Sequence, residues 1–279
     1  MPLSDSETKE LVATAAKIRC GIVDVTSWAG GSHIGGALSQ TDILTILYFK
    51  YMNIDPSNPR WDDRDRFVLS KGHGGVGQVV VLANKGYFDP EILKNYGKLG
   101  SPFSMHMNAE KVPGVDISTG SLGHGLPQAV GLAMGAKYRK KPWITYCLVG
   151  DGECHEGTIW EAAMAASHYK LDNLVCFVDR NQLCVDGCTE DVMRLEPFAD
   201  KWAAFGWTVK TVDGHSFPEL AEAIDFAIAN KEGPVVIIAN TVKGKGYSFI
   251  ENNPSWHYGS LDSVRMAEAK KSFGGDYSE

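Results

Sequence analysis

Residues 144–187 read ITYCLVGDGECHEGTIWEAAMAASHYKLDNLVCFVDRNQLCVDG. Two apolar runs in this stretch, 144–149 and 174–178, have the length and composition of buried β-strands. A Gly-Asp-Gly turn and an alanine-rich helical stretch separate them, so the segment predicts strand, turn, helix and strand in that order. Two such strands are expected to be parallel, and the polar residues that follow them should then lie side by side at one edge of a sheet.

The same alternation continues along the chain on both sides of this segment. Strands are expected at 67–69, 144–149, 174–178, 207–212 and 235–239, and helices at 4–28, 39–51, 75–86, 122–139, 156–169, 197–205 and 216–230. Ser216 is the expected N-cap of the last of these helices, with Pro218 in its first turn. A short polar helix and a frayed end are expected within 260–279. The pattern predicts an α/β fold with a doubly wound, mainly parallel sheet and helices on both faces.

Composition indicates a globular protein and limits its partners. The chain has 279 residues, 30 glycines and 44% hydrophobic residues, which suits one large α/β domain over residues 1–279. The net charge is −7 and the dense basic clusters are confined to 139–141 and to the lysines at 243 and 245, so a nucleic-acid surface is not expected. The six cysteines form no CxxC pair, which favours a reducing cytoplasm. The polar N-terminus and the lack of long apolar runs argue against secretion and membrane insertion.

Asp151 and Asn181 follow the two strands of the opening segment. Magnesium prefers six oxygen ligands and is usually held by one or two protein groups together with ligand phosphates. Asp151, the side-chain oxygen of Asn181 and the backbone carbonyl of Leu183 would supply three of these oxygens. Gly150 and Gly152 allow a close approach of the backbone, and the helix that begins near 155 directs its partly positive end at the same place. A Gly-Asp-Gly sequence is also a common tight turn, so the motif alone leaves a purely structural interpretation open.

The segment resembles the thiamine diphosphate motif of transketolases, and the resemblance extends over nearly the whole chain. It is carried, in the family's order, by SHIGGALSQTDIL from residue 32, DRDRFVLSKGHG from 63, PGVDISTGSLGHGL from 113, the Gly-Asp-Gly segment, EDVMRLEPFADKWAAFGW from 190 and NTVKGKGYSFIENNPSWH from 240. The extent is similar to the N-terminal half of transketolase in organisms that divide the enzyme between two chains. The resemblance implies the thiamine-diphosphate-binding fold known as the PP domain.

The resemblance also implies roles for individual residues. The expected magnesium ligands are Asp151, Asn181 and Leu183. The residues expected to contact thiamine diphosphate are His73, Gly120, Ser121, Leu122, Gly150, Gly152, Glu153, Asn181 and His257. The expected catalytic residues are His33, His106, His257 and Glu156. The three histidines resemble those that orient sugar hydroxyls and move protons, although each taken alone could be an ordinary loop histidine.

Glu156 matches a glutamate that pairs across a subunit interface with the activating glutamate of the partner. An acidic residue at a helix N-terminus can also be merely stabilising. The remaining histidines, His155, His168 and His215, are assigned structural roles.

Several positions depart from the family's pattern. Ile34 and Met107 stand where proline is common, and Asn108 stands where an acidic residue is common. His124 replaces a frequent glutamine, and Arg180 precedes Asn181 where asparagine or aspartate is frequent. The substrate-facing rim is therefore altered, whereas the expected metal ligands are intact.

The implied reaction is the transfer of a two-carbon ketol unit from a ketose, by default phosphorylated, to an aldose. The activating glutamate, the pyrimidine pocket and the substrate-phosphate arginines lie in the family's later half. A partner chain with the pyrimidine-binding and C-terminal domains is therefore expected, in an assembly of two copies of each. The small face formed by Ala162, Ala163, Ala165 and Ala166 is an expected packing surface for such an assembly, although it could also pack on its own sheet.

Other functions remain open from the sequence alone. The α subunit of a 2-oxo acid dehydrogenase shares the Gly-Asp-Gly motif, but STGSLGHGL and ENNPSWH argue against it. Deoxyxylulose phosphate synthase is a relative that is normally one long chain. A cofactor-binding module without catalysis is a further alternative, which the retained histidines disfavour. A nicotinamide dehydrogenase is disfavoured because no GxGxxG opens a strand-to-helix turn near the start.

Overall fold

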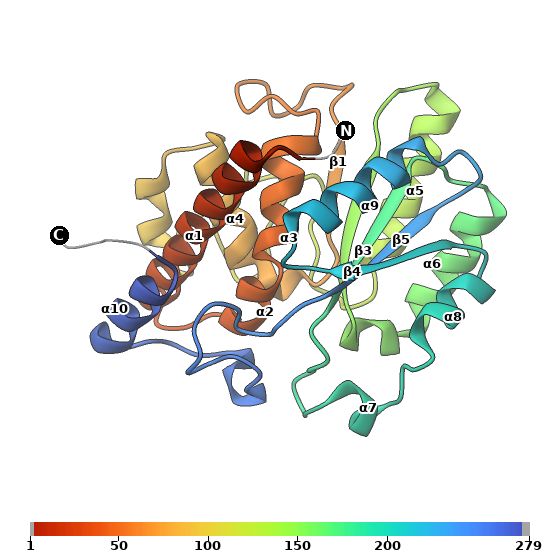
Figure 1. The fold of residues 1–279 in the computed structure, drawn as a ribbon. Coiled ribbons are helices and arrows are strands. Elements are labelled where there is room, and N and C mark those ends of the chain that lie inside the picture. Colours follow the sequence, from red (N-terminus) through yellow and green to blue (C-terminus); the bar gives the residue numbers. More distant parts are fainter. Residues whose placement is uncertain (1–2, 275–279) are drawn as a thin grey trace.

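A five-stranded parallel sheet forms the centre of the molecule (Figure 1). The structure, a computed structural model, describes residues 3–274. The strands lie in the order β1-β2-β3-β5-β4, and every neighbouring pair is parallel. Their bounds are β1 (Arg66–Leu69), β2 (Thr145–Gly150), β3 (Leu174–Arg180), β4 (Thr208–Asp213) and β5 (Val235–Asn240). The five expected strands and their parallel arrangement are confirmed, with boundaries that move by one or two residues.

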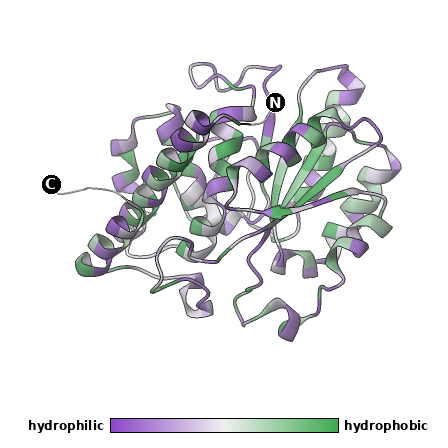
Figure 2. Ribbon diagram, viewed as in Figure 1, coloured by the Kyte–Doolittle hydropathy of each residue, from purple (hydrophilic) through white to green (hydrophobic). Residues whose placement is uncertain are grey.

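Helices cover both faces of the sheet. One face packs on α1 (Asp5–Trp28), α3 (Thr41–Ile46), α4 (Gly75–Lys85) and α9 (Phe217–Ala229), and the other on α5 (Gly125–Arg139), α6 (Gly157–His168) and α8 (Phe198–Ala204). Successive side chains of a strand point to opposite faces. Phe177 accordingly belongs to the first core, whereas Cys176 and Val178 belong to the second. Strands β1, β2, β3 and β5 are buried along almost their whole length and largely apolar, whereas the edge strand β4 is less buried and carries polar residues (Figure 2).

Local sequence explains where the helices α1 and α9 begin. Ser4 caps α1 in a capping box with Glu7, since each side chain bonds to the other residue's backbone amide. Ser216 caps α9 by accepting a hydrogen bond from the amide of Glu219, and a proline occupies the first turn. The expected N-cap at Ser216 is therefore confirmed.

The helix expected at 39–51 is divided and begins earlier. Its pieces are α2 (Ile34–Ser39), α3 and a π-helical turn at Leu47–Tyr51. Gly35 and Gly36 have low intrinsic helix propensity, which obscured the start at Ile34 in the sequence. Tertiary packing explains the glycine, because a Cβ atom at Gly35 would lie 2.6 Å from the backbone oxygen of Trp256.

The remaining elements are short and lie mainly near the carboxyl edge of the sheet. They are the 3-10 turns Gly72–Gly74, Pro90–Asn95, Gly152–His155 and Pro254–His257, and the helices α7 (Thr189–Val192) and α10 (Ser263–Ser272). The expected polar helix near the C-terminus is α10, and the frayed end expected after it lies outside the described residues. The helix expected from 122 begins only at Gly125, because residues 118–124 form irregular turns.

The alanine-rich helix α6 packs against its own sheet. Ala162, Ala163 and Ala166 are buried in the same core as Val149 and Val178. The prediction that this alanine face packs in an assembly is thus wrong for those three residues, since small side chains here permit close helix-to-sheet packing. The outer face of α6 instead exposes Met164. Among the described residues, no helix is long and apolar enough to cross a membrane.

Candidate cofactor and catalytic site

A cavity of about 250 Å³ opens where β1, β2, β3 and β5 end at their carboxyl termini. Its lining includes most of the residues predicted from sequence: His33, His73, Gly120, Leu122, Gly150, Asp151, Gly152, Glu153, Asn181, Leu183 and His257. Segments far apart in the chain thus meet at one place, as expected for a ligand site in an open parallel sheet. Ser121, His106 and Glu156 do not line the cavity itself.

Asp151 and Asn181 lie at the ends of the adjacent strands β2 and β3. Oδ1 of Asp151 accepts a hydrogen bond of 2.8 Å from the amide of Gly152, and Oδ2 accepts one of 2.5 Å from the amide of Gln182. Nδ2 of Asn181 donates toward Asp179 over 3.3 Å, so the amide oxygen of Asn181 points the other way. Burial raises the pKa of Asp151, an effect that a bound cation would oppose.

Lys243 bonds to the third predicted ligand. Its Nζ donates to the backbone oxygens of Leu183 and Cys184 over 3.1 and 3.0 Å. Lys243 is almost completely buried, and burial followed by the charge of Lys71 lowers its pKa to about 8. Lys243 lines the cavity, where its ammonium group can attract an anion.

Glu153 is held by protein groups rather than left free for a ligand. Its carboxylate accepts hydrogen bonds from Ser70 Oγ and from the amides of Gly123 and Gly150. Burial raises the pKa of this carboxyl. Glu153 was predicted to contact the cofactor, and it does line the cavity. Its side chain also ties the 120–123 turn to the ends of β1 and β2. Its contribution is to shape the cavity wall.

Three imidazole rings that line the cavity form a cluster. The ring centroids of His33, His73 and His257 lie 5.1–5.2 Å from one another. Burial, together with neighbouring charges, lowers the pKa of His33 to about 4, of His73 to about 2 and of His257 to about 3. All three rings are therefore neutral near pH 7 and can donate one hydrogen bond and accept another.

The cluster leaves one polar atom free. Nδ1 of His33 is buried and has no hydrogen-bond partner among the described residues. His106 lies just outside the cavity, beside Gly120, where a Cβ atom on that glycine would be 3.4 Å from the His106 ring. The predicted histidines are thus brought close together, with His106 at the rim.

A buried ion pair that the sequence did not predict supports the cavity floor. Lys71 Nζ donates to Asp179 Oδ2 over 2.5 Å, and the two side chains are 2% and 0% exposed. Ser39 and Thr241 also donate to Asp179. Burial acts to raise the pKa of Asp179, but Lys71 and the two hydroxyl groups outweigh it and hold the pKa below its usual value.

The other residues singled out from sequence lie outside the cavity. Glu156 is exposed at the start of α6, and its carboxylate makes no hydrogen bond or ion pair within residues 3–274. His155 bonds to the backbone of Met193, and His168 contacts Tyr169. His215 links the buried Asp42 to the amide of Val242. These contacts agree with the structural roles expected for the three histidines.

The donor set suits a divalent cation bound together with a diphosphate. Within the described residues, no group of three His, Cys, Asp or Glu side chains could hold a metal by itself. The lining offers one carboxylate, one amide oxygen and one carbonyl oxygen, the last two of which already accept one hydrogen bond each. Mg²⁺ commonly completes such a set with phosphate oxygens. Gly152 allows the 150–152 turn to pack closely on Cys184, because a Cβ atom there would lie 3.0 Å from Cβ of Cys184. Lys71, Lys243 and the imidazoles favour an anion beside the cation.

The fold and the cavity define a class of protein: one with a diphosphate and metal site at the carboxyl edge of a parallel sheet. Residues 10–279 match the family model described as transketolase, thiamine diphosphate binding domain. The chain belongs to this family as an N-terminal transketolase subunit, and its cofactor is thiamine diphosphate with a divalent metal ion such as Mg²⁺.

Relatives from two bacteria have similar length. A 6-deoxy-6-sulfo-D-fructose transketolase subunit from Clostridium sp. is 45% identical over 82% of this chain and 83% of the relative. An apulose-4-phosphate transketolase subunit from Phocaeicola vulgatus is 43% identical over 94% of this chain and 92% of the relative. The transketolase structure from Leishmania mexicana superimposes with a TM-score of 0.91 at 31% identity, covering 96% of this chain but 42% of that one. The chain therefore spans about two fifths of that structure.

Proposed function

We propose that this chain is the diphosphate-binding subunit of a two-chain transketolase that moves a two-carbon ketol unit from a ketose to an aldose. The observation that carries the proposal is the meeting of Asp151, Asn181 and the three neutral imidazoles in one cavity at the carboxyl edge of the sheet. When bound, thiamine diphosphate supplies the electron sink for breaking and forming the C–C bond. The chain's own residues place the cofactor and exchange protons with the sugar.

The cation and the diphosphate would be held by different parts of the cavity. Asp151, Asn181 and the Leu183 carbonyl are the proposed metal ligands. The proposed diphosphate contacts are His73, Gly152, Lys243 and His257, of which Lys243 was found only in the structure. Gly120, Ser121 and Leu122 form the turn proposed to meet the aminopyrimidine half.

Proton exchange with the sugar is assigned to the histidine cluster. Nδ1 of His33 is buried and has no partner in the part of the chain that the structure describes, so it can accept a proton or a hydroxyl hydrogen without first breaking a protein hydrogen bond. His106 at the rim is placed to contact a longer part of the substrate. Neutral imidazoles serve both tasks near pH 7.

We further propose that residues 1–279 form one PP domain and that a second chain supplies the pyrimidine-binding and C-terminal domains, in an assembly of two copies of each. The exposed carboxylate of Glu156, which has no partner within residues 3–274, supports this, because a carboxylate at an interface can share a proton with a second carboxylate. The sulfonated and phosphorylated ketoses in the names of the two bacterial relatives suggest a donor sugar with an anionic tail.

The proposal is tested by mixing the chain with its partner subunit, thiamine diphosphate and Mg²⁺. Ketol transfer is followed by NMR for ketoses that carry a phosphate, a sulfonate or no anionic group, with one aldose acceptor. The expected result is transfer that requires both chains and the cofactor. Decarboxylation of a 2-oxo acid without ketol transfer would contradict the proposal.

A further inference from the structure

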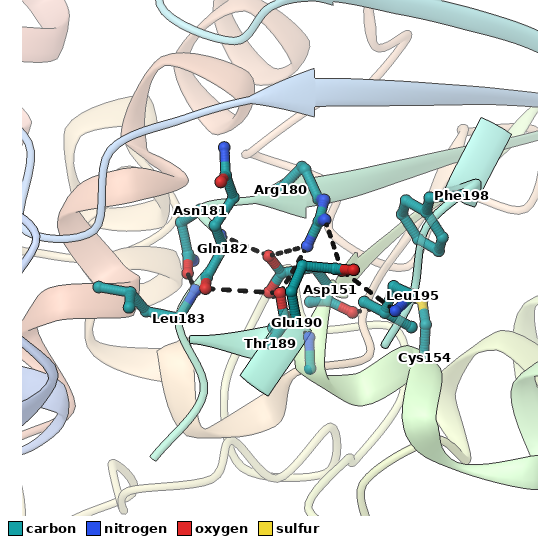
Figure 3. A network of polar contacts seen from close by, with 12 residues as sticks. Asp151, Cys154, Arg180, Asn181, Gln182, Leu183, Thr189, Glu190, Leu195 and Phe198 are labelled. Atoms are coloured by element: carbon teal, nitrogen blue, oxygen red, sulfur yellow. Dashed lines mark hydrogen bonds and ion pairs between the residues drawn. The ribbon is translucent and has the colours of Figure 1, made fainter. Parts of the chain in front are cut away.

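Arg180 is the centre of a polar network behind the proposed metal site (Figure 3). It ends β3 and is 4% exposed. Nη1 donates to Asp151 over 3.2 Å, and Nη2 donates to Glu190 over 3.2 Å and to Glu196 over 2.9 Å. One guanidinium is thus shared by three carboxylates, one of which is a proposed metal ligand.

Arg180 contacts only one of the two carboxylate oxygens of Asp151, namely Oδ2. Oδ2 accepts from both Arg180 and the amide of Gln182, whereas Oδ1 accepts, among the described residues, from the amide of Gly152 alone. Oδ1 is consequently the oxygen with free capacity to bind a cation. A guanidinium beside Oδ2 also reduces the attraction of the carboxylate for that cation, and burial leaves this effect poorly screened.

Glu190 and Glu196 are fixed in place by backbone amides. Glu190 accepts from the amides of Leu195 and Glu196, and Glu196 accepts from the amide of Phe198. Their carboxylates are more exposed than that of Asp151, at 29% and 56% against 2%. Both can therefore be replaced by glutamine without leaving a buried cavity.

We propose that Glu190 and Glu196 set the cation affinity of Asp151 by acting through Arg180. The four groups carry one positive and three negative charges, so the network is net negative by two. The two glutamates draw the guanidinium charge toward themselves and leave Asp151 attractive to a cation. Without them, the whole charge of Arg180 falls on Asp151 and the network becomes neutral. They are positioning residues, and the inference rests on the proposed role of Asp151 as a metal ligand.

The test measures metal affinity directly. Mn²⁺ is titrated into the full chain with its partner subunit and saturating thiamine diphosphate, and free Mn²⁺ is counted by electron paramagnetic resonance. Substitution of groups that orient a metal ligand typically weakens metal binding about 10- to 100-fold. The Glu190→Gln/Glu196→Gln variant is expected to lose affinity by that factor. The matched control, Asp191→Asn/Asp200→Asn, removes two exposed charges from the same region without contacting Arg180 and should stay close to wild type.

A triple variant separates charge from folding. Adding Arg180→Gln to the double variant removes the uncompensated guanidinium and is expected to recover most of the lost affinity. Wild-type affinity in the double variant would overturn the inference. A triple variant that binds no better than the double variant would also overturn it, because disruption of the 189–198 segment would then explain the loss. Failure of the wild-type complex to bind Mn²⁺ with thiamine diphosphate would instead overturn the proposed function.

Discussion

Lys243 Nζ and His257 Nδ1 lie 3.0 Å apart, and this contact determines which nitrogen of His257 carries the proton. A lysine ammonium group has donors and no acceptor, so Nδ1 must accept and Nε2 carries the hydrogen. His257 thereby presents an N–H group on its other side, which suits an anion or a sugar oxygen.

Replacing Lys243 with methionine is expected to remove the preference of His257 for the Nε2–H tautomer. The variant should show a mixture of the two neutral forms by ¹⁵N NMR, whereas the wild type shows the Nε2–H form. Burial and then Lys243 lower the pKa of His257 to about 3, so its pKa should rise in the variant but stay below 6.5, because burial remains. Lys245→Met, on the same segment, is the control and should leave the His257 spectrum unchanged. An unaltered tautomer in Lys243→Met would contradict the assignment.

The Lys71–Asp179 pair should contribute strongly to stability. Asp179→Asn leaves a charged lysine buried without its counter-ion, and breaking a buried pair in this way costs about 3–5 kcal/mol. Urea unfolding followed by tryptophan fluorescence would measure the change in free energy of unfolding. Glu91→Gln is the control, since its pair with Lys94 is exposed and such pairs contribute at most about 1 kcal/mol. Equal small losses in both variants would show that solvent reaches the pair.

The strands, and the meeting of Asp151 and Asn181 in one cavity, were predictable because each depends on a short stretch of sequence. Continuous apolar runs marked the strands. Asp151 and Asn181 come two and three positions after the runs that end at Val149 and Val178. The Lys71–Asp179 pair was not predictable, because its partners are 108 positions apart and each alone resembles a charged strand end. Glu153 was assigned to the cofactor from its motif, and only the folded chain shows its bonds to Ser70 and Gly123.

Arg180 illustrates a different limit of sequence analysis. The sequence showed that an arginine stands at 180, where the family commonly has asparagine or aspartate. The effect of Arg180 depends on Glu190 and Glu196, which contact it only in the folded chain. The division of the 34–51 helical region was hidden for a related reason. Gly35 disfavours a helix locally, whereas close packing against Trp256 requires it.

Asp151 should control the response of the two-chain complex to its cofactor. Thiamine diphosphate with Mg²⁺ is expected to raise the melting temperature, because a ligand that binds only the folded state stabilises it by mass action. Asp151→Asn keeps the shape of the side chain and removes the charge, and should abolish the shift, as should removal of the metal with EDTA. Asp191→Asn is the control. A full cofactor-induced shift in Asp151→Asn would refute the metal assignment.

His33 should affect turnover far more than cofactor affinity. Its ring belongs to the histidine cluster, and its Nδ1 has no hydrogen-bond partner within residues 3–274. General acid–base groups contribute about 10²–10⁴-fold to rate. His33→Ala is expected to lower kcat within that range and to leave the apparent affinity for thiamine diphosphate nearly unchanged. His168→Ala, on the exposed end of α6, is the control. An intact kcat combined with weakened binding of thiamine diphosphate would show that His33 binds the cofactor rather than transferring protons.

The assembly should contain two copies of this chain and two of a partner. Leu122 and Val185 are exposed at the cavity, which leaves apolar surface for other parts of an assembly to cover. The Glu156 carboxylate is exposed nearby and has no partner within residues 3–274, whereas the alanine face of α6 is already buried on its own sheet.

Light scattering should therefore give the mass of a four-chain complex only when both chains are present. Glu156→Gln should preserve that mass while reducing ketol transfer, because the glutamine still fits the interface but cannot share a proton with a carboxylate. A loss of the four-chain mass in Glu156→Gln would show that Glu156 holds the subunits together rather than acting in catalysis. Full ketol transfer by this chain alone would overturn the two-chain interpretation, because residues 1–279 would then have to supply the activating carboxylate themselves.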